Sequence, residues 1–263
     1  MKKFRLFIPS LISILVLLLT SCAVKHESIN IKENNAETIL EKIQLYEGAI
    51  RSLKSLAKVK IKTPDSKISY TQVTIAQRPD LLRLEALNPF GKTVGFISSD
   101  GTNIYIISPS ERGVYDLGEK FDLAYVYPGL KLKISAENLV NLILGRLPVN
   151  VYDMETVPEL SVDGERIKLV FYSETSIGQN TLWVNGMNFK VEKAEFTLDN
   201  GARAKINYEY FDSLIDGYYF PRIIEFSSEG FSISIIYEPD VELNKDVNKT
   251  LFKPAPEVVK FEK

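Results

Sequence analysis

An alternation of apolar and polar residues recurs along this chain, and it constrains the fold more than any other feature. A period of two is typical of a β-strand with one face buried and the other in water. The alternation is clearest in the stretches whose apolar members are Ala57, Val59 and Ile61; Ile167, Leu169 and Phe171; Ala204, Ile206, Tyr208 and Tyr210; and Phe231, Ile233, Ile235 and Tyr237. Turn-forming pairs such as Asp100-Gly101, Asn185-Gly186 and Glu229-Gly230 separate such stretches. The pattern predicts a large antiparallel meander.

Two helical patterns accompany the strands. Apolar residues at steps of three and four predict an amphipathic helix before the first strand: Ile39, Ile43, Tyr46, Ile50 and Leu53. A second helix begins after Ser135, a good N-cap residue, and is weakened and ended by Gly145 and Pro148. Its wide apolar face consists of Leu139, Val140, Ile143, Leu144 and Leu147.

Together these patterns predict a fold that is mainly β with α. Two helices cannot cover both faces of so large a sheet, so the sheet is expected to curl into a half-open barrel with the helices over its concave face. Side chains either fill the interior or leave a cavity for an apolar ligand. The candidates for the cavity wall and its helical lid are Leu139, Ile143, Leu144, Ile206, Tyr208, Ile233 and Ile235.

The N-terminus reads as a lipoprotein leader. Basic Lys2, Lys3 and Arg5 precede a short apolar run that ends in Leu19-Thr20-Ser21-Cys22. The run is too short for a membrane span of about 20 residues, and small residues stand before the cysteine, which favours cleavage there. Cys22 is the chain's one cysteine and is expected to carry diacylglycerol, an anchor in the membrane. We therefore expect a cleaved signal peptide at 1–21, a lipidated flexible tether at 22–35 and a single half-barrel domain at 36–263.

Composition argues against most enzyme classes. The one histidine, His26, lies in the tether with Cys22, so Ser/His/Asp and Cys/His catalysis and most transition-metal sites are disfavoured. Neither a metal site nor a cofactor beyond the lipid on Cys22 is expected. Carboxylate pairs exist, among them Glu155 with Glu159 and Glu192 with Glu195, but exposed acidic residues are the rule. Without the leader, 29 Lys and Arg stand against 34 Asp and Glu, which disfavours nucleic-acid binding.

One predicted connection between strands, Leu87-Asn88-Pro89-Phe90-Gly91, carries an aromatic residue where a hairpin normally shows a polar one. Phe90 either folds back to plug the mouth of the sheet or projects into a lipid interface or a partner's groove. The loop residues Leu87, Pro89, Phe90 and Gly91 are therefore candidates for membrane insertion or cargo transfer.

The same loop, together with Asn141-Leu142-Ile143-Leu144-Gly145-Arg146-Leu147-Pro148 on the second helix, resembles the LolB family of outer-membrane lipoprotein receptors. In that family a loop projects an apolar leucine, whose place Phe90 takes here, and a similar segment ends the corresponding helix. The lipobox, the leading helix, the order of elements and the Asp100-Gly101 turn agree as well, and the match covers roughly residues 36–150 in motif and order. The chain departs from the family in its greater length, with an added stretch that ends in Leu251-Phe252-Lys253-Pro254-Ala255-Pro256.

The resemblance implies a monomeric carrier in the periplasm that holds acyl chains of lipoproteins, received from a LolA-type carrier, and delivers them to the outer membrane. Ala23, rather than Asp, follows Cys22, which is expected to send the protein to the periplasmic face of the outer membrane. Because Phe90 and the greater length depart from the family, the cargo could instead be another lipid or lipidated molecule. The alternative function is a lipid-anchored sensor or scaffold, with its interior filled by its own side chains and an interface that includes loop tyrosines such as Tyr125, Tyr127, Tyr152, Tyr218 and Tyr219.

Overall fold

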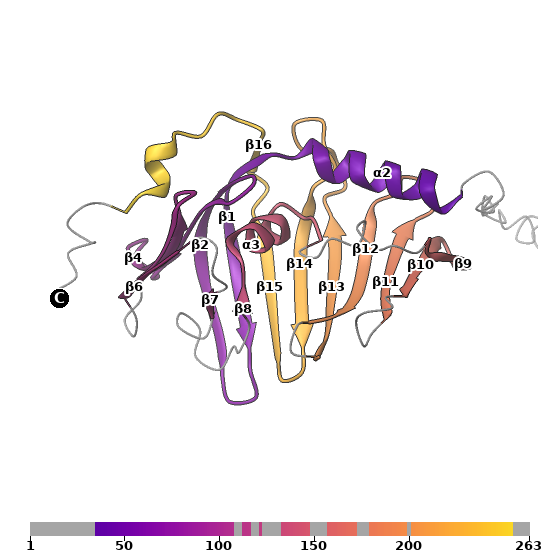
Figure 1. The fold of residues 1–263 in the computed structure, drawn as a ribbon. Coiled ribbons are helices and arrows are strands. Elements are labelled where there is room, and N and C mark those ends of the chain that lie inside the picture. The colour runs from indigo at the N-terminus through magenta and orange to yellow at the C-terminus, as the bar shows by residue number, and fades with distance from the viewer. Residues whose placement is uncertain are drawn as a thin grey trace, which may run out of the picture. The chain divides into compact units, whose positions relative to one another are not determined.

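The alternating stretches form one long antiparallel sheet in a computed structural model of the chain (Figure 1). The structure describes residues 35–107, 112–116, 121–122, 133–147, 157–172, 179–198 and 201–254. The expected leader, Cys22, the tether up to residue 34, Glu155 and three of the loop tyrosines (Tyr125, Tyr127 and Tyr152) lie outside these residues, so the division at 21 and 35 stays a prediction.

Two meanders build the sheet, and each runs between neighbours in sequence. The first consists of β1 (Ser52–Lys62), β2 (Lys67–Gln77), β3 (Leu81–Leu87), β4 (Thr93–Ser99), β5 (Asn103–Ile107) and β6 (Arg112–Asp116). The second consists of β9 (Glu159–Asp163), β10 (Arg166–Tyr172), β11 (Gln179–Asn185), β12 (Val191–Thr197), β13 (Arg203–Tyr210), β14 (Pro221–Ser228) and β15 (Phe231–Tyr237). Two smaller pairings add β16 (Glu242–Leu243) to β1 and join β7 (Phe121–Asp122) to β8 (Lys133–Ile134).

The meanders join where β1 pairs with β15, with Ala57 opposite Tyr237 and Ile61 opposite Ile233. The path therefore runs from β6 to β1, crosses to β15 and continues to β9. Its two end strands, β6 and β9, do not pair with each other in the described part of the chain, so the sheet is open. The predicted half-open antiparallel sheet with two helices is confirmed.

Burial along β1 follows the predicted period of two. Val59 and Ile61 are buried, whereas Lys58, Lys60 and Lys62 are exposed. Because residues directly opposite each other on neighbouring strands point to the same face, the register carries this division across the sheet. The concave face is largely apolar, and β1 presents a row of lysines on the convex face.

Helix α2 (Ala36–Ala49) begins at Asn35, whose side chain accepts a hydrogen bond from Thr38 N at 2.8 Å. In Figure 1 it runs across the strand ends of the second meander. The predicted apolar stripe runs past the end of this helix: Ile50 is an extended C-cap and Leu53 belongs to β1. Both are buried, so hydrophobic spacing alone could not locate the helix end.

Helix α3 (Ala136–Ile143) lies over the concave face, and Ser135 caps it through Asn138 N at 3.2 Å. Gly145 follows the helix with a φ of +74°, and a Cβ there would lie 2.6 Å from the ring of Pro221 on β14. Only glycine adopts this positive φ readily and leaves room for the proline ring. The chain can therefore turn sharply here, and the C-terminal end of α3 packs on the second meander. Pro148 lies outside the described residues.

The C-terminal stretch, which departs from the LolB pattern, covers the convex face of the first meander. A short helix, η3 (Lys249–Phe252), places Phe252 against Ile75 and Leu81, where it is fully buried. Ser98 donates a hydrogen bond to the carbonyl of Phe252, and Arg83 donates one to the carbonyl of Leu251 at 2.8 Å. The convex face is therefore covered around Ile75, Leu81 and Ser98, which are all buried.

Candidate functional site

An apolar cavity lies between α3 and the concave face where the two meanders meet. Its wall comes from strands β1 to β4, β14 and β15, and its cover is the apolar face of α3. The free volume is about 40 Å³, far below the roughly 300 to 1,000 Å³ of sites that enclose drug-sized ligands. In this closed state the interior is nearly filled by the protein's own side chains.

Four of the predicted wall and lid residues line this cavity: Leu139 and Ile143 from α3, and Ile233 and Ile235 from β15. Ile206 and Tyr208 are buried on the same face, but they lie beyond β14 and do not reach the cavity. Leu144 is also buried, and it borders a separate small cleft under α2.

The first meander also contributes to the wall, which the sequence patterns did not predict. Val59, Ile61, Leu84 and Ile97 line the cavity, and so does Gln72. The alternation predicts the inward direction of Val59 and Ile61, but it does not predict that β1 pairs with β15. Pairing between residues about 170 positions apart has no local signal in the sequence.

The polar contacts that hold α3 sit at its C-terminal end. The Tyr237 hydroxyl donates to the carbonyl of Ile143 at 2.8 Å, and the Tyr208 hydroxyl donates to the carbonyl of Arg146 at 2.9 Å. These carbonyls lie in and just after the last turn, which has no further helical donors. Burial raises the pKa of both phenols above the ordinary value of 10.0, so both remain neutral donors at physiological pH.

A carboxylate on α2 braces the same end of α3. Glu47 accepts a hydrogen bond from Leu147 N at 3.3 Å and forms an ion pair with Arg146 at 3.9 Å. Both charged side chains are largely buried, with exposed fractions of 10% for Glu47 and 16% for Arg146. Breaking this pair would leave a buried charge uncompensated, so the contact ties the lid to α2.

A small cleft of about 30 Å³ separates α2 from β12 to β14. Lys190 lies in it, with its ammonium 4.5 Å from the ring centres of both Tyr210 and Tyr219. Burial lowers the pKa of Lys190, while the charge of Glu192 opposes this shift. Stacking of the cation on two rings accounts for its position here.

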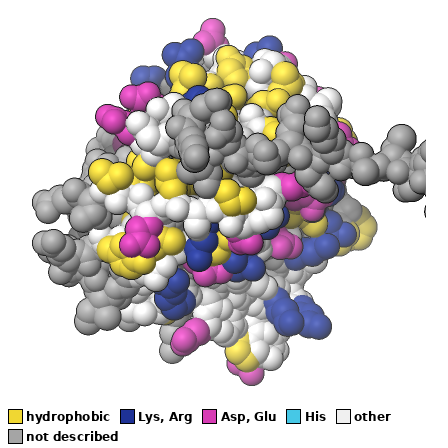
Figure 2. Space-filling model, turned by 90° about the vertical axis from the view of Figure 1, so that its right-hand side faces the viewer, with side chains coloured by type: hydrophobic (Ala, Val, Ile, Leu, Met, Phe, Trp, Pro, Cys, Tyr) yellow, Lys and Arg dark blue, Asp and Glu magenta, His cyan; other side chains and the backbone are white. Residues whose placement is uncertain are grey.

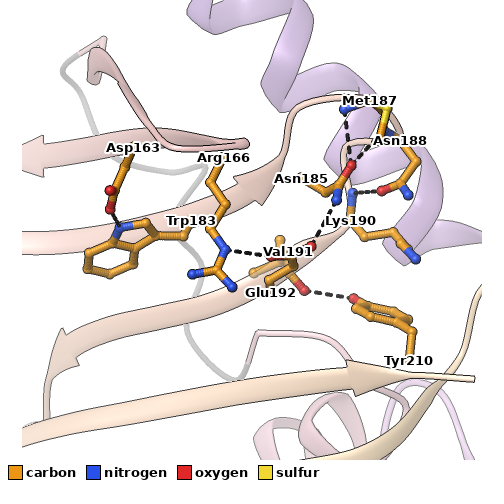
Figure 3. A network of polar contacts seen from close by, with 10 residues as sticks. All are labelled: Asp163, Arg166, Trp183, Asn185, Met187, Asn188, Lys190, Val191, Glu192 and Tyr210. Atoms are coloured by element: carbon orange, nitrogen blue, oxygen red, sulfur yellow. Dashed lines mark hydrogen bonds and ion pairs between the residues drawn. The ribbon is translucent and has the colours of Figure 1, made fainter. Parts of the chain in front are cut away.

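A polar network holds the turn from β11 to β12 beside this cleft (Figure 3). The Asn185 side chain accepts hydrogen bonds from Met187 N and Asn188 N at 3.0 and 3.2 Å, and it donates to Glu192 at 2.9 Å. Arg166 donates to the other oxygen of Glu192 at 2.6 Å. Glu192, one of the carboxylates considered for catalysis, is thus engaged by structural partners.

The other described carboxylates that were considered for catalysis also have structural partners. Glu195 forms ion pairs with Lys193 at 2.7 Å and Arg203 at 3.9 Å. Glu159 accepts a hydrogen bond from Tyr172 at the sheet edge. Among the described residues, no group of His, Cys, Asp or Glu is large enough to hold a metal ion.

The β3–β4 hairpin tip presents Phe90 to solvent, and this residue is 88% exposed. The Asn88 side chain accepts hydrogen bonds from Phe90 N and Lys92 N at 2.9 and 3.0 Å, and Gly91 has a φ of +75°. Pro89 and Gly91 are exposed and Leu87 is half-buried. A fixed backbone therefore presents an aromatic side chain that the rest of the described chain leaves uncovered, unlike the plug considered from sequence.

Alternating strand directions place this tip at the end of the sheet opposite α2. The β1–β2 hairpin tip lies at the same end, and near it Ile61 and Tyr70 line the cavity.

At the β9 side of the molecule, Figure 2 shows hydrophobic side chains gathered in the upper half, with charges of both signs around them. No helix in the described ranges combines the length and apolar character that a membrane crossing requires.

Comparisons with known proteins identify the fold. No family model matches the sequence, and no curated protein matches it either. A LolA superfamily protein from Nitrosomonas europaea aligns with a TM-score of 0.55 at 19% identity, covering 84% of this chain and 98% of that one. A domain named for outer membrane lipoprotein sorting, from Vibrio parahaemolyticus, gives 0.51 at 11% identity over 84% and 96%. A DUF1329 family protein from Desulfovibrio piger gives 0.56 at 13% identity over 83% and 95%.

Proposed function

We propose that this chain, whose fold is that of LolA superfamily proteins, is an envelope-anchored carrier of acyl chains that helps deliver lipoproteins to the outer membrane. The observation that carries the proposal is the apolar cavity between an open sheet and a single short helix. An acyl chain has no polar groups along its length, so an apolar wall is its complement.

Binding in this cavity requires α3 to move. A volume of about 40 Å³ is close to the share of one water molecule in the liquid, roughly 30 Å³, so no acyl chain fits the closed state. Helix α3 is short, and among the described residues its polar contacts with the sheet and with α2 are concentrated at its C-terminal end. Release of these contacts would let the helix move away from the sheet and open the cavity beneath it while the sheet stays intact.

The proposed contact with the membrane or with cargo is the loop of Leu87, Pro89, Phe90 and Gly91. An exposed aromatic ring on a fixed turn can enter a lipid interface without refolding of the loop. The loop shares its end of the sheet with strand ends that line the cavity, which suits transfer between the two.

The proposed setting is the periplasmic face of the outer membrane, with lipid on Cys22 as the anchor and a LolA-type carrier as donor. The name of the Vibrio protein, which refers to outer membrane lipoprotein sorting, agrees with this setting. Fractionation of membranes tests the location, because co-migration of the mature protein with inner-membrane markers would contradict it.

A second candidate is a lipid-anchored scaffold or sensor without a transported ligand. The specific observation in its favour is the small free volume, since an interior filled by its own side chains needs no ligand. The half-exposed Tyr218 and exposed Tyr219 beside α2 would suit a protein interface.

Lipid binding by the mature, full-length protein separates the two candidates. We expect fatty acid or phospholipid in solvent extracts of protein purified from membranes, and saturable uptake of a fluorescent fatty acid. Ile233→Arg, on the cavity wall, should weaken uptake, whereas Lys205→Ala, on the convex face, should not. Thermal melting of both variants checks folding. Equal uptake by two folded variants, or none by the wild type, would reject the carrier.

A further inference from the structure

An amide side chain stands in the largely apolar wall of the cavity. Gln72, on β2, is 3% exposed and lines the space beneath α3. Its direct neighbours on the same face are Ala57 on β1 and Ala86 on β3, and Gly95 on β4 follows Ala86 in the same row. These neighbours are small, so the side chains directly beside Gln72 in this row occupy little volume.

The amide is only partly satisfied. Its Nε2 donates to the Thr74 hydroxyl at 3.0 Å. An amide carries two N–H donors and one acceptor oxygen, and the Thr74 hydroxyl oxygen meets only one N–H. This is the one hydrogen bond of the Gln72 side chain among the described residues, and it leaves Oε1 and the second N–H for a ligand that enters the cavity. A ligand that forms hydrogen bonds with these groups would be favoured over one that displaces water from the cavity without replacing its hydrogen bonds.

We infer that Gln72 is a specificity-determining residue that recognises the amide linkage of an N-acyl chain. A secondary amide offers an N–H to Oε1 and a carbonyl to the spare N–H of Gln72. An ester offers the carbonyl alone, and a hydrocarbon offers neither. The inference rests on the proposed function, because it assigns the chemical class of ligand to the same cavity.

A pair of ligands that differ in one atom tests this inference. N-Methyldodecanamide and methyl dodecanoate have the same shape, but only the amide can donate a hydrogen bond. Displacement of a bound fluorescent fatty acid from the mature full-length protein gives both affinities. We expect the amide to bind about tenfold more tightly, since one buried hydrogen bond contributes about that factor. Gln72→Met should reduce this ratio to near one while both ligands still bind.

A second variant separates recognition from packing. Ile97→Val alters the same wall without touching the amide, so it should keep the preference for the amide ligand. Thermal melting shows whether each variant is folded. Equal affinities in the wild type, or an unchanged preference in Gln72→Met, would overturn the role of Gln72 and leave the carrier standing. No displacement by either ligand and no probe uptake would reject the carrier itself.

Discussion

At the scale of single residues, side chains of one chemical kind serve opposite purposes in this molecule. Phe220 is buried 5.0 Å from the ring of Tyr237, and Phe252 is buried on the convex face, whereas Phe90 is presented to solvent by a turn that Asn88 holds in place. The sequence identifies all three as large and apolar. Only the turn chemistry around Phe90 indicates that its environment differs.

Replacement of Phe90 should separate surface function from stability. Phe90→Ala should change the free energy of unfolding by less than about 0.5 kcal/mol, because the ring makes little contact with the fold. The same change should weaken binding to phospholipid vesicles, measured in a Cys22→Ser protein that lacks the anchor. Phe220→Ala is the matched control, and it should cost about 3 to 5 kcal/mol because it empties a core site. A wild-type level of vesicle binding in Phe90→Ala would show that the ring has no role at the membrane.

The hydroxyl of Tyr237 should matter for both stability and its pH dependence. Tyr237→Phe leaves the carbonyl of Ile143 unpaired, so it should cost about 1 to 3 kcal/mol in denaturant unfolding. Burial raises the pKa of the folded-state phenol, so its contribution is complete below the ordinary value of 10.0. Above that pH the unfolded chain ionises first, and stability falls as the pH rises.

The variant has no such group, so its stability should fall less steeply above pH 10 than that of the wild type. Parallel slopes for the two proteins would show that Tyr237 ionises as easily in the folded state as in the unfolded chain.

At the scale of elements, local patterns predicted most of the strands and both helices, because alternation and capping act over a few residues. Ser135 caps α3 as predicted, and Gly145 ends it. Three features depended on distant contacts and were not predictable. They are the end of α2 before Ile50, the β1–β15 pair, and the docking of Phe252 on the convex face.

The same reason explains which parts of the candidate site were found. Ile233 and Ile235 are inward by their own alternation and line the cavity, whereas Ile206 follows the identical pattern and lies outside it. Alternation predicts which face of the sheet a side chain points to, but it does not predict where its strand lies relative to the cavity. Gln72 was missed because a polar residue at an inward position looks like an exposed one in the sequence.

The C-terminal stretch should act as a structural clamp on the first meander. Phe252 is fully buried against Ile75 and Leu81, so Phe252→Ala should cost about 3 to 5 kcal/mol in the free energy of unfolding. The neighbouring Leu251 is exposed, and Leu251→Ala should have little effect. Denaturant titrations of both variants measure the difference. Equal midpoints would mean that the stretch covers the face without stabilising it.

At the scale of the whole molecule, the parts have separate mechanical roles. The two meanders share one continuous backbone ladder across β1 and β15, which makes the floor of the cavity rigid. Helix α3 is the short element over that floor, and α2 braces its C-terminal end through Glu47. The sheet is held by a continuous ladder of backbone hydrogen bonds, whereas α3 is held by few polar contacts. Local opening is therefore expected at α3.

Loosening that brace should therefore speed ligand entry. The apparent affinity of a site that opens only part of the time is reduced by the fraction of open molecules. Glu47→Ala removes the hydrogen bond from Leu147 N and the ion pair with Arg146, which favours the open state. We expect faster uptake of a fluorescent fatty acid in stopped-flow mixing and a higher apparent affinity, by up to about tenfold for a loss near 1.4 kcal/mol. Glu41→Ala, at an exposed position on the same helix, is the control and should leave both unchanged. Slower uptake by a folded Glu47→Ala protein would mean that α3 must be braced for binding, and that opening does not limit entry.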